Sequence, residues 1–422
     1  MFLDSLRSIK DDLSRSIFYW LTFVMTSMFI FLFFNLSYSD MVGVHFINSQ
    51  NNMSTFITVM VITICMIVIF FANDFFVKKK AKDLAVRLVC GSTYLQIAKY
   101  LLYQTGILLF IAIPVGIACA IGLIPFVNMF LVHYLHSQEV ITIQASAIYS
   151  TILILSIVII WCTILNLGYS FRNSIKTLLT DDKMIPSSLS LPSFYNLHID
   201  IKIKKALSWI LFLGPIIGIY YYGSDVKSIL AFSVIGMIGF YMFLDKVFIS
   251  YLNEMTHHKK TNQPITLITF GLLRNNIKVL KKNIILLIVS DILLIALMVS
   301  CLKNPIEMML ALISFVVMNI LLSLSIMFKL STEVSTRKKI YDSIERIGYM
   351  KDSQKKILKN EILSFYGFIF ICSLLYIVNI FISLILRGFL ESYLCLILVF
   401  IFMFPLFLCA IMNYIYYRKV IL

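Results

Sequence analysis

The residues best suited to chemistry in this sequence are charged side chains in two short segments, residues 82–92 and 338–349. Each segment follows a long apolar stretch, and each contains one glycine, Gly91 in the first and Gly348 in the second. Charged groups of this kind can form ion pairs with another protein. The pattern therefore predicts a protein that a partner contacts at two related places.

Alignment of the two glycines brings further residues into register. Lys82 then falls on Lys339, nine residues before the glycine, and Gln104 falls on Glu361, thirteen residues after it. A basic loop on the inner side of a membrane is also rich in lysine and arginine, but it has no reason to repeat in register. We therefore interpret both segments as coupling elements, which pass force from a partner into the helix that follows.

Each coupling element reads as a short helix that a glycine ends, so that the chain can turn. Its leucine or isoleucine residues share an apolar face, and its charged residues are available for pairing across an interface. The candidate coupling residues are Lys82, Asp83, Leu84, Arg87, Gly91, Ile340, Ile344, Arg346 and Gly348.

Polar residues inside apolar spans are a second group of candidates, because an ionisable group in a membrane is costly and usually has a role. They are Asp291, Glu361 and Gln104. Asp291 has no basic neighbour in the sequence. It either pairs with another helix or with water, or it contacts a substrate directly.

No enzyme motif accompanies these residues. The sequence contains no G-x-x-x-x-G-K-[ST], H-E-x-x-H or G-x-S-x-G pattern, and these patterns carry nucleotide, zinc and nucleophilic-serine chemistry. The eight cysteines show no metal-ligand spacing. We expect neither catalysis nor a metal site in this chain.

The composition is that of a membrane protein. Hydrophobic residues make up 60% of the chain and charged residues 14%, which a soluble domain cannot accommodate. Apolar runs predict an all-α polytopic protein with about ten transmembrane helices. The net charge of +15 lies in loops between spans, so we expect contact with the lipid bilayer and no nucleic acid. The distribution of lysine and arginine predicts cytoplasmic termini.

The order of the spans predicts two similar modules around a central hairpin. The first module occupies residues 1–170 and the second residues 264–422, each with four spans. Residues 171–206 form a polar cytoplasmic linker, and residues 207–263 a two-span hairpin. Within that hairpin a G-x-x-x-G pattern, Gly214 and Gly218, predicts close helix contact.

Residues 82–92, KDLAVRLVCGS, resemble the signature of the FtsX-like permease family, roughly K-E-[IL]-[AG]-[IV]-x-[RK]-x-[LM]-G-[AS]. Asp83 stands where the family usually has Glu. Residues 338–349, KKIYDSIERIGY, are a looser copy, and Glu361 matches the acid at the start of the next span. The ten-span layout is most similar to bacitracin-resistance permeases, but residues 301–307 leave no room for their large extracellular domain.

The resemblance implies the permease subunit of a type VII ABC transporter in the bacterial cytoplasmic membrane. A separate dimer of ABC ATPases would bind ATP and Mg, while this chain binds no cofactor. The implied substrate is an amphipathic peptide or a lipid-like molecule, exported or extracted from the membrane, with antimicrobial-peptide resistance or bacteriocin export as the specific expectation. The alternatives are a secondary transporter or channel without an ATPase, and a signalling membrane protein that modulates a sensor kinase.

Overall fold

The computed structural model describes residues 2–11, 13–39, 52–135, 141–172, 201–222, 226–257, 264–301, 305–388 and 390–421. Of these residues 94% are helical and none forms a strand, and nine helices among them are long and apolar enough to cross a membrane. The prediction of an all-α polytopic membrane protein is therefore confirmed. The chain divides into two compact units, Met1–His198 and Ile199–Leu422, which are described separately. Most of the predicted linker, 171–206, lies outside the described residues.

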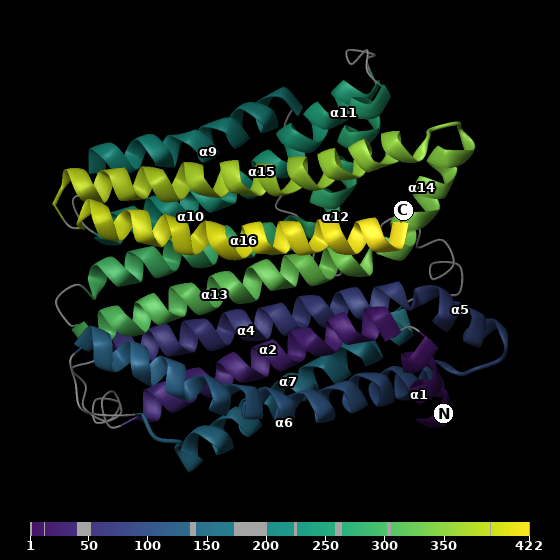
Figure 1. Cartoon of the computed structure of the whole chain (residues 1–422), viewed down its shortest axis with the longest axis horizontal. Helices are drawn as coiled ribbons and strands as arrows, with labels where there is room; N and C mark the ends of the chain where they lie inside the picture. Colours follow the sequence, from purple (N-terminus) through teal and green to yellow (C-terminus); the bar gives the residue numbers. More distant parts are fainter. Residues whose placement is uncertain are drawn as a thin grey trace. The chain divides into compact units, whose positions relative to one another are not determined.

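Among the residues that the structure describes, the first unit contains two short helices and four long ones (Figure 1). The long helices have 26 to 42 residues, and at 1.5 Å per residue each exceeds the ~30 Å of hydrocarbon in a bilayer. In chain order the helices are α1 (Phe2–Asp11), α2 (Leu13–Tyr38), α4 (Asn52–Lys79), α5 (Ala81–Val89), α6 (Tyr94–Leu135) and α7 (Ala145–Arg172).

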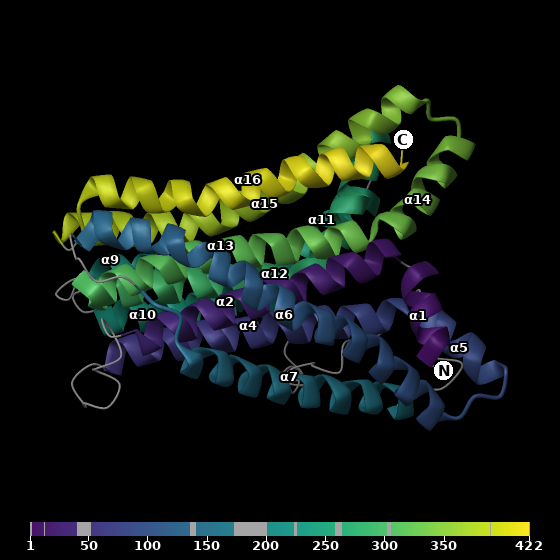
Figure 2. The same cartoon turned by 60° about the horizontal axis from the view of Figure 1, so that its bottom comes forward.

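Helix α2 is the centre of this unit and packs against α4, α6 and α7. It meets α6 closely at Gly116, where a Cβ atom would overlap the Ser27 side chain. The short helices α1 and α5 lie together at one end of the unit, beside the N-terminus (Figure 2). The N-terminus is therefore at the same end as the first coupling element.

In the described part of the second unit there are nine helical elements (Figure 1). One of them, η2, is a π-helical segment that joins α10 to α11 within one continuous helical run. The elements are α9 (Ile201–Tyr222), α10 (Val226–Met242), η2 (Phe243–Phe248), α11 (Ile249–His257), α12 (Pro264–Ser300), α13 (Pro305–Thr332), α14 (Val334–Arg346), α15 (Lys351–Leu386) and α16 (Ser392–Ile421).

The second unit contains a four-helix arrangement in which α12 contacts α13 and α15, and α16 contacts α13 and α15. Helix α12 ends at Ser300 and α13 begins at Pro305, so no extracellular domain fits between them. The short helix α14 lies near the C-terminus in both ribbon views (Figures 1 and 2). The C-terminus is therefore at the same end of its unit as the second coupling element.

The central hairpin is formed by α9 and by the helical run that begins with α10. Within the described residues, the apolar part of α9 is Lys205–Ile219, and the next candidate span is Val234–Met255. Gly218 faces the Phe232 ring, whereas Gly214 has no atom within 4 Å of an added Cβ. The closest approach occurs at Gly239 of α10, against the backbone of α9 at Leu211.

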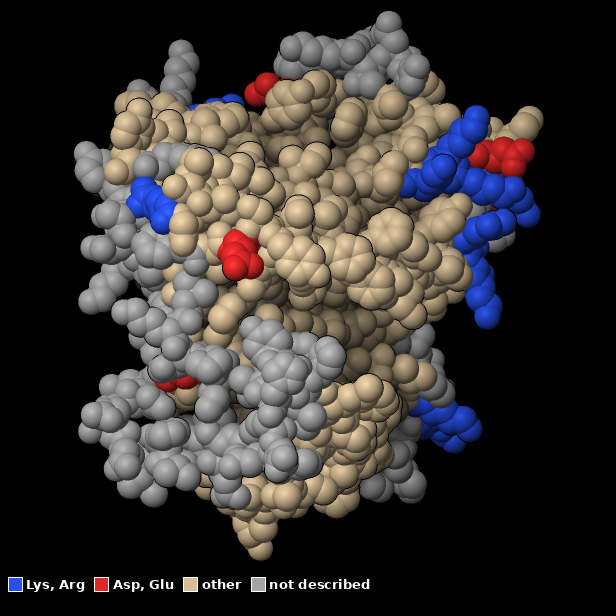
Figure 3. Space-filling view, turned by 60° about the vertical axis from the view of Figure 1, so that its left-hand side comes forward, with Lys and Arg blue, Asp and Glu red and all other residues tan. Residues whose placement is uncertain are grey.

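The surface of the described residues agrees with a lipid environment. In the space-filling view, most of the described face carries no charge (Figure 3). Large apolar side chains are exposed along the long helices, among them Phe110, Trp161, Leu363 and Phe400. Hydrocarbon chains cover such faces at no desolvation cost.

Candidate functional site

Both coupling elements end in the same hydrogen-bonded turn. Gly91 has φ 93° and Gly348 φ 104°, a left-handed conformation that favours glycine. Gly91 N–H donates to Leu88 O at 3.0 Å, and Ser92 N–H donates to Arg87 O at 3.0 Å. These two bonds define a Schellman motif, which ends a helix and satisfies its last carbonyl groups.

The second turn repeats this pattern position by position. Gly348 N–H donates to Glu345 O at 2.9 Å, and Tyr349 N–H donates to Ile344 O at 3.3 Å. The two glycines that the sequence aligns therefore have the same structural role. In both units the chain ends a short helix, turns, and enters the long helix that follows, α6 or α15.

The apolar face of α5 packs inside its own unit. Leu84 is buried in a cluster with Val77, Ile97 and Leu101. The Arg87 guanidinium lies 3.9 Å from the centre of the Tyr100 ring, a cation–π contact that holds α5 against α6. Leu84 and Arg87 thus hold the coupling helix α5 against α6, inside the first unit.

The remaining candidates of the first element are arranged differently. Asp83 and Gly91 are exposed, and the Lys82 side chain lies outside what the structure describes. Gln104 of α6 is fully buried, and its Nε2 donates to the Tyr100 hydroxyl at 2.9 Å. Tyr100 therefore contacts both a coupling-helix residue and an intramembrane candidate.

In the second element, Ile344 is buried and Ile340 is half-buried, so the predicted apolar face again packs against the unit. Arg346 and Gly348 are exposed. The outward-facing residues of α14 are thus its charged side chains and the turn.

Sequence reasoning grouped Ile347 with the apolar residues Ile340 and Ile344, but it missed that apolar side chains are exposed beside both turns. Val89 is 65% exposed, Ile347 76% and Met350 80%. Exposed aliphatic groups next to a rigid turn are suited to insertion into a groove of a partner. Their signal in the sequence is their position beside the aligned glycines.

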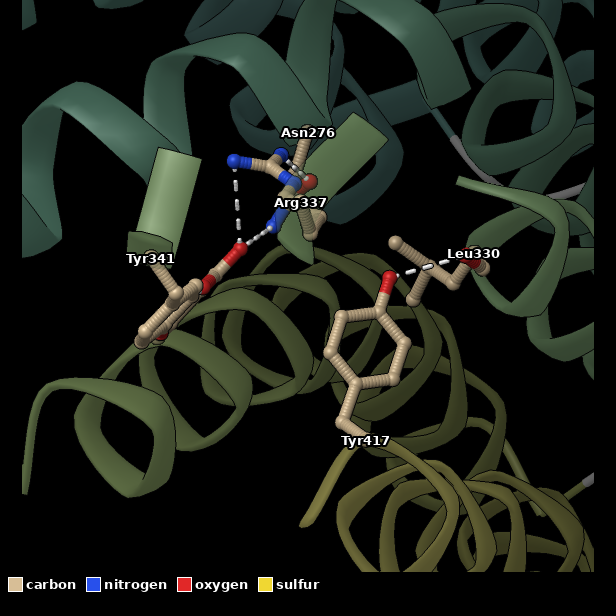
Figure 4. A network of polar contacts seen from close by, with 6 residues as sticks. Asn276, Leu330, Arg337, Tyr341 and Tyr417 are labelled. Carbon is tan, nitrogen blue, oxygen red and sulfur yellow. Dashed lines mark hydrogen bonds and ion pairs between the residues drawn. The ribbon is translucent and has the colours of Figure 1, made fainter. Parts of the chain in front are cut away.

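Beneath α14 lies a buried polar cluster that joins three helices (Figure 4). Arg337 of α14 is 2% exposed and Glu361 of α15 is 1% exposed, and Arg337 Nη1 lies 3.5 Å from Glu361 Oε1. Arg337 also donates to Asn276 Oδ1 of α12. Asn276 Nδ2 donates to Glu361 Oε1 at 2.9 Å, and the Tyr341 hydroxyl donates to Glu361 Oε2 at 3.1 Å. We call these four residues the anchor cluster.

The Tyr341 hydroxyl keeps its proton in the anchor cluster. Burial is the main cause that raises the pKa of Tyr341, and the adjacent Glu361 carboxylate adds to it. The Tyr341 hydroxyl therefore stays protonated and remains a donor. The same view shows Tyr417 pointing to the main chain at Leu330, whose oxygen accepts its hydroxyl at 2.8 Å (Figure 4).

The first unit has a buried cation at the matching place. Lys80 lies eleven residues before Gly91, as Arg337 lies eleven before Gly348. Lys80 is 1% exposed and its Nζ donates to Ser8 Oγ of α1 at 3.1 Å. In each unit a buried cation thus ties the coupling element to the first helix of that unit's four-span group.

A second shared feature is an asparagine on the last long helix of each group. In the first unit Asn166 Oδ1 accepts from Asn73 at 2.9 Å, and its Nδ2 donates to Thr105 at 3.5 Å. In the second, Asn413 Oδ1 accepts from Ser331 at 2.9 Å, and its Nδ2 donates to Tyr366 at 2.6 Å. Each asparagine therefore links the helices before and after the coupling element.

Comparison with known families finds a match, which includes the first of the two coupling elements. Residues 55–178 match the model described as FtsX-like permease C-terminal. The chain carries an FtsX-like permease domain. The match begins in α4 and includes the first coupling element, α6 and α7. No curated protein matches the sequence.

The FtsX-like permease domain confirms the family indicated by residues 82–92. The domain supports an ABC transporter permease subunit and a multi-pass membrane protein. Among the residues that the structure describes, no three His, Cys, Asp or Glu side chains are grouped to hold a metal ion.

The intramembrane acid Asp291 is enclosed by protein. Asp291 of α12 is fully buried, and neither carboxylate oxygen has a hydrogen-bond partner among the described residues. The buried Asn319 side chain of α13 lies beside it. In this conformation a substrate cannot reach Asp291, so direct substrate contact would need α12 and α13 to separate.

Asp291→Asn is expected to leave folding nearly unchanged, within ~1 kcal/mol, because an amide of the same shape buries no charge. Asp291→Lys is expected to abolish folded protein, since it places a larger cation in the same enclosed site. Gel-filtration yield and thermal unfolding in detergent measure both effects. Failure of Asp291→Asn to fold would show that the carboxylate charge itself is required.

Proposed function

We propose that this chain is the permease of an ABC transporter in which a dimer of separate ATPases docks on the turns at Gly91 and Gly348. ATP and Mg bind to the ATPases, and their closure moves the coupling elements. The observation that carries the proposal is the repeated Schellman turn with an exposed apolar tip, one copy of which lies inside the FtsX-like permease match.

The apolar surface supports a proposal for the substrate class. The long helices expose aliphatic and aromatic side chains, and no extracellular domain stands between α12 and α13. We propose that an amphipathic peptide or lipid-like molecule is taken directly from the bilayer and is exported or extracted. Resistance to an antimicrobial peptide, or bacteriocin export, is the specific role that this substrate class favours.

The proposed location is the bacterial cytoplasmic membrane, with both termini in the cytoplasm. Each terminus lies at the coupling-element end of its own unit (Figures 1 and 2), and ATPases are cytoplasmic. A sensor kinase as a further partner, with the chain acting as a signalling protein, remains the alternative when an ATPase binds but no substrate moves. A secondary transporter is the alternative when transport needs no nucleotide.

Co-purification with the ATPase tests the proposal. Val89→Asp and Ile347→Asp together are expected to reduce the bound ATPase at least about tenfold, because carboxylates at both tips cannot enter an apolar groove. The conservative pair Val89→Ile and Ile347→Val is the control and should retain the ATPase. Equal recovery with the aspartate pair would contradict docking at these turns.

Cys90 provides an independent probe at the first turn. Cys90 is exposed on the turn, whereas Cys119 is exposed within the membrane-spanning helix α6. A charged, membrane-impermeant maleimide is expected to label Cys90 in the permease alone and to react at least about tenfold more slowly when the ATPase dimer is bound. Cys90→Ser should remove the labelling, and Cys119→Ser should not. An unchanged rate in the complex would place the ATPase elsewhere.

A further inference from the structure

We propose that Arg337 and Glu361 are positioning residues, which fasten the coupling helix α14 to both α12 and α15 so that the three helices move as one body. The anchoring is a property of the chain alone. Its consequence for transport, that a push on α14 reaches two spans at once, rests on the proposed function.

The first step is the closed geometry of the anchor cluster. Arg337 contacts Asn276 and Glu361, and these two also contact each other. Each contact joins a different pair of helices: α14 with α12, α14 with α15, and α12 with α15. A displacement of any one helix therefore breaks two contacts of this triangle.

The second step is the cost of breaking it. Both charged side chains are almost completely buried, and a buried charge without its partner is strongly unfavourable. Water outside the protein cannot compensate unless the helices separate. The cluster therefore resists relative sliding of α14 more strongly than the apolar contacts of Ile344, which lose little energy over a small displacement.

The third step is the position of the cluster relative to the docking turn. Arg337 lies eleven residues before Gly348, so the exposed tip and the anchor are at opposite ends of one short helix. A rigid helix held at one end and pushed at the other transmits the displacement to what holds it. Here that is α12 and α15.

The first unit offers a matched comparison. Lys80 replaces Arg337 and contacts Ser8 of α1, while Gln104 stands at the position of Glu361. The acid that closes the triangle in the second unit thus has no counterpart at position 104. Glu361→Gln gives the second unit the side chain that the first unit already tolerates, which makes it the mildest informative change.

Hydrogen exchange in the purified chain tests the anchoring. Glu361→Gln is expected to speed amide exchange across residues 334–346 at least about tenfold, because α14 opens locally when its anchor is weakened. Glu345→Gln, on the exposed side of the same helix, is the control and should change nothing there. Tyr341→Phe removes one hydroxyl donor and should fall between the two. Equal exchange in Glu361→Gln and Glu345→Gln would overturn the proposal.

Exchange in the complex with the ATPase tests the consequence. In the wild-type complex, ATP with Mg is expected to change exchange in α12 and α15 together. With Glu361→Gln the ATPase should still co-purify and hydrolyse ATP, but the nucleotide-dependent change in α12 and α15 should fall at least about fivefold. Arg337→Lys, which keeps the charge, should retain part of it.

The experiment on the purified chain and the experiment on the ATPase complex distinguish failure of the anchoring from failure of the proposed function. If no ATPase binds the wild-type chain, the proposed function fails, while the exchange of residues 334–346 in the purified chain still decides the anchoring. If the ATPase binds and Glu361→Gln leaves the change in α12 and α15 intact, the positioning role is overturned and the proposed function stands. Thermal unfolding of each variant shows that the folded chain is being compared.

Discussion

Arg337→Met is expected to lower the free energy of unfolding by about 3–5 kcal/mol, because it leaves the buried Glu361 carboxylate without its cation. Methionine nearly fills the volume of the arginine stem, so the loss reports charge more than packing. Reversible unfolding in mixed micelles measures the effect. This is a large fraction of the stability of an ordinary domain.

The double replacement separates charge from position. Arg337→Met combined with Glu361→Leu buries no charge, so we expect it to recover part of the lost stability. Recovery is incomplete because Asn276 and Tyr341 lose the carboxylate to which they donate. The cycle of the two single variants and the double variant gives the coupling energy directly. A double variant as unstable as the sum of the single ones would show that the two side chains act independently.

An exposed pair is the control for this cycle. Lys355 and Asp352 lie 3.0 Å apart near the start of α15, with side chains 48% and 87% exposed. Water and salt screen such pairs, so Lys355→Met is expected to have no measurable effect on unfolding. The contrast between Lys355 and Arg337 tests burial as the cause.

The sequence predicts the coupling turns well because their cause is local. Only the residues next to a helix end determine a Schellman turn, and a glycine at Gly91 or Gly348 meets the backbone requirement by itself. Aligned glycines therefore indicated the same turn in both copies. The family resemblance of residues 82–92 is confirmed for the same reason, since the motif is contiguous.

The burial of the Lys80 and Arg337 side chains could not be predicted from the sequence. Basic residues near the inner end of a span normally lie in loops, and neither side chain has a sequence neighbour that shows otherwise. What buries them is a helix distant in the chain, α1 for Lys80 and α12 for Arg337. Only the packing of helices reveals such a neighbour.

The sequence also does not predict which face of each coupling element is buried within its own unit and which is exposed. Helical spacing correctly places Leu84 and Ile344 on apolar faces, but it does not say what covers a face. Both residues are buried within their own units. The apolar groups left for a partner, Val89 and Ile347, lie at the ends of the two coupling helices and are exposed.

Gly239→Val is expected to disrupt the packing of α9 against α10, at a cost of about 3 kcal/mol or more. A Cβ atom at Gly239 would overlap the backbone carbonyl of Leu211. A flexible side chain could rotate away from the new group, but a helix backbone cannot, so the two helices must separate. Thermal unfolding and protease resistance of residues 201–257 measure the loss.

The matched control is Gly214→Val, the same replacement in the same hairpin. An added Cβ at Gly214 has nothing within 4 Å, and valine costs a helix no more than glycine does, so we expect no loss of stability. The G-x-x-x-G pattern of the sequence predicts the opposite, with Gly214 the sensitive position. A larger effect at Gly214 than at Gly239 would therefore favour a contact made by α9 with another partner over the helix register observed here, because small residues mark a close contact only where a second helix lies.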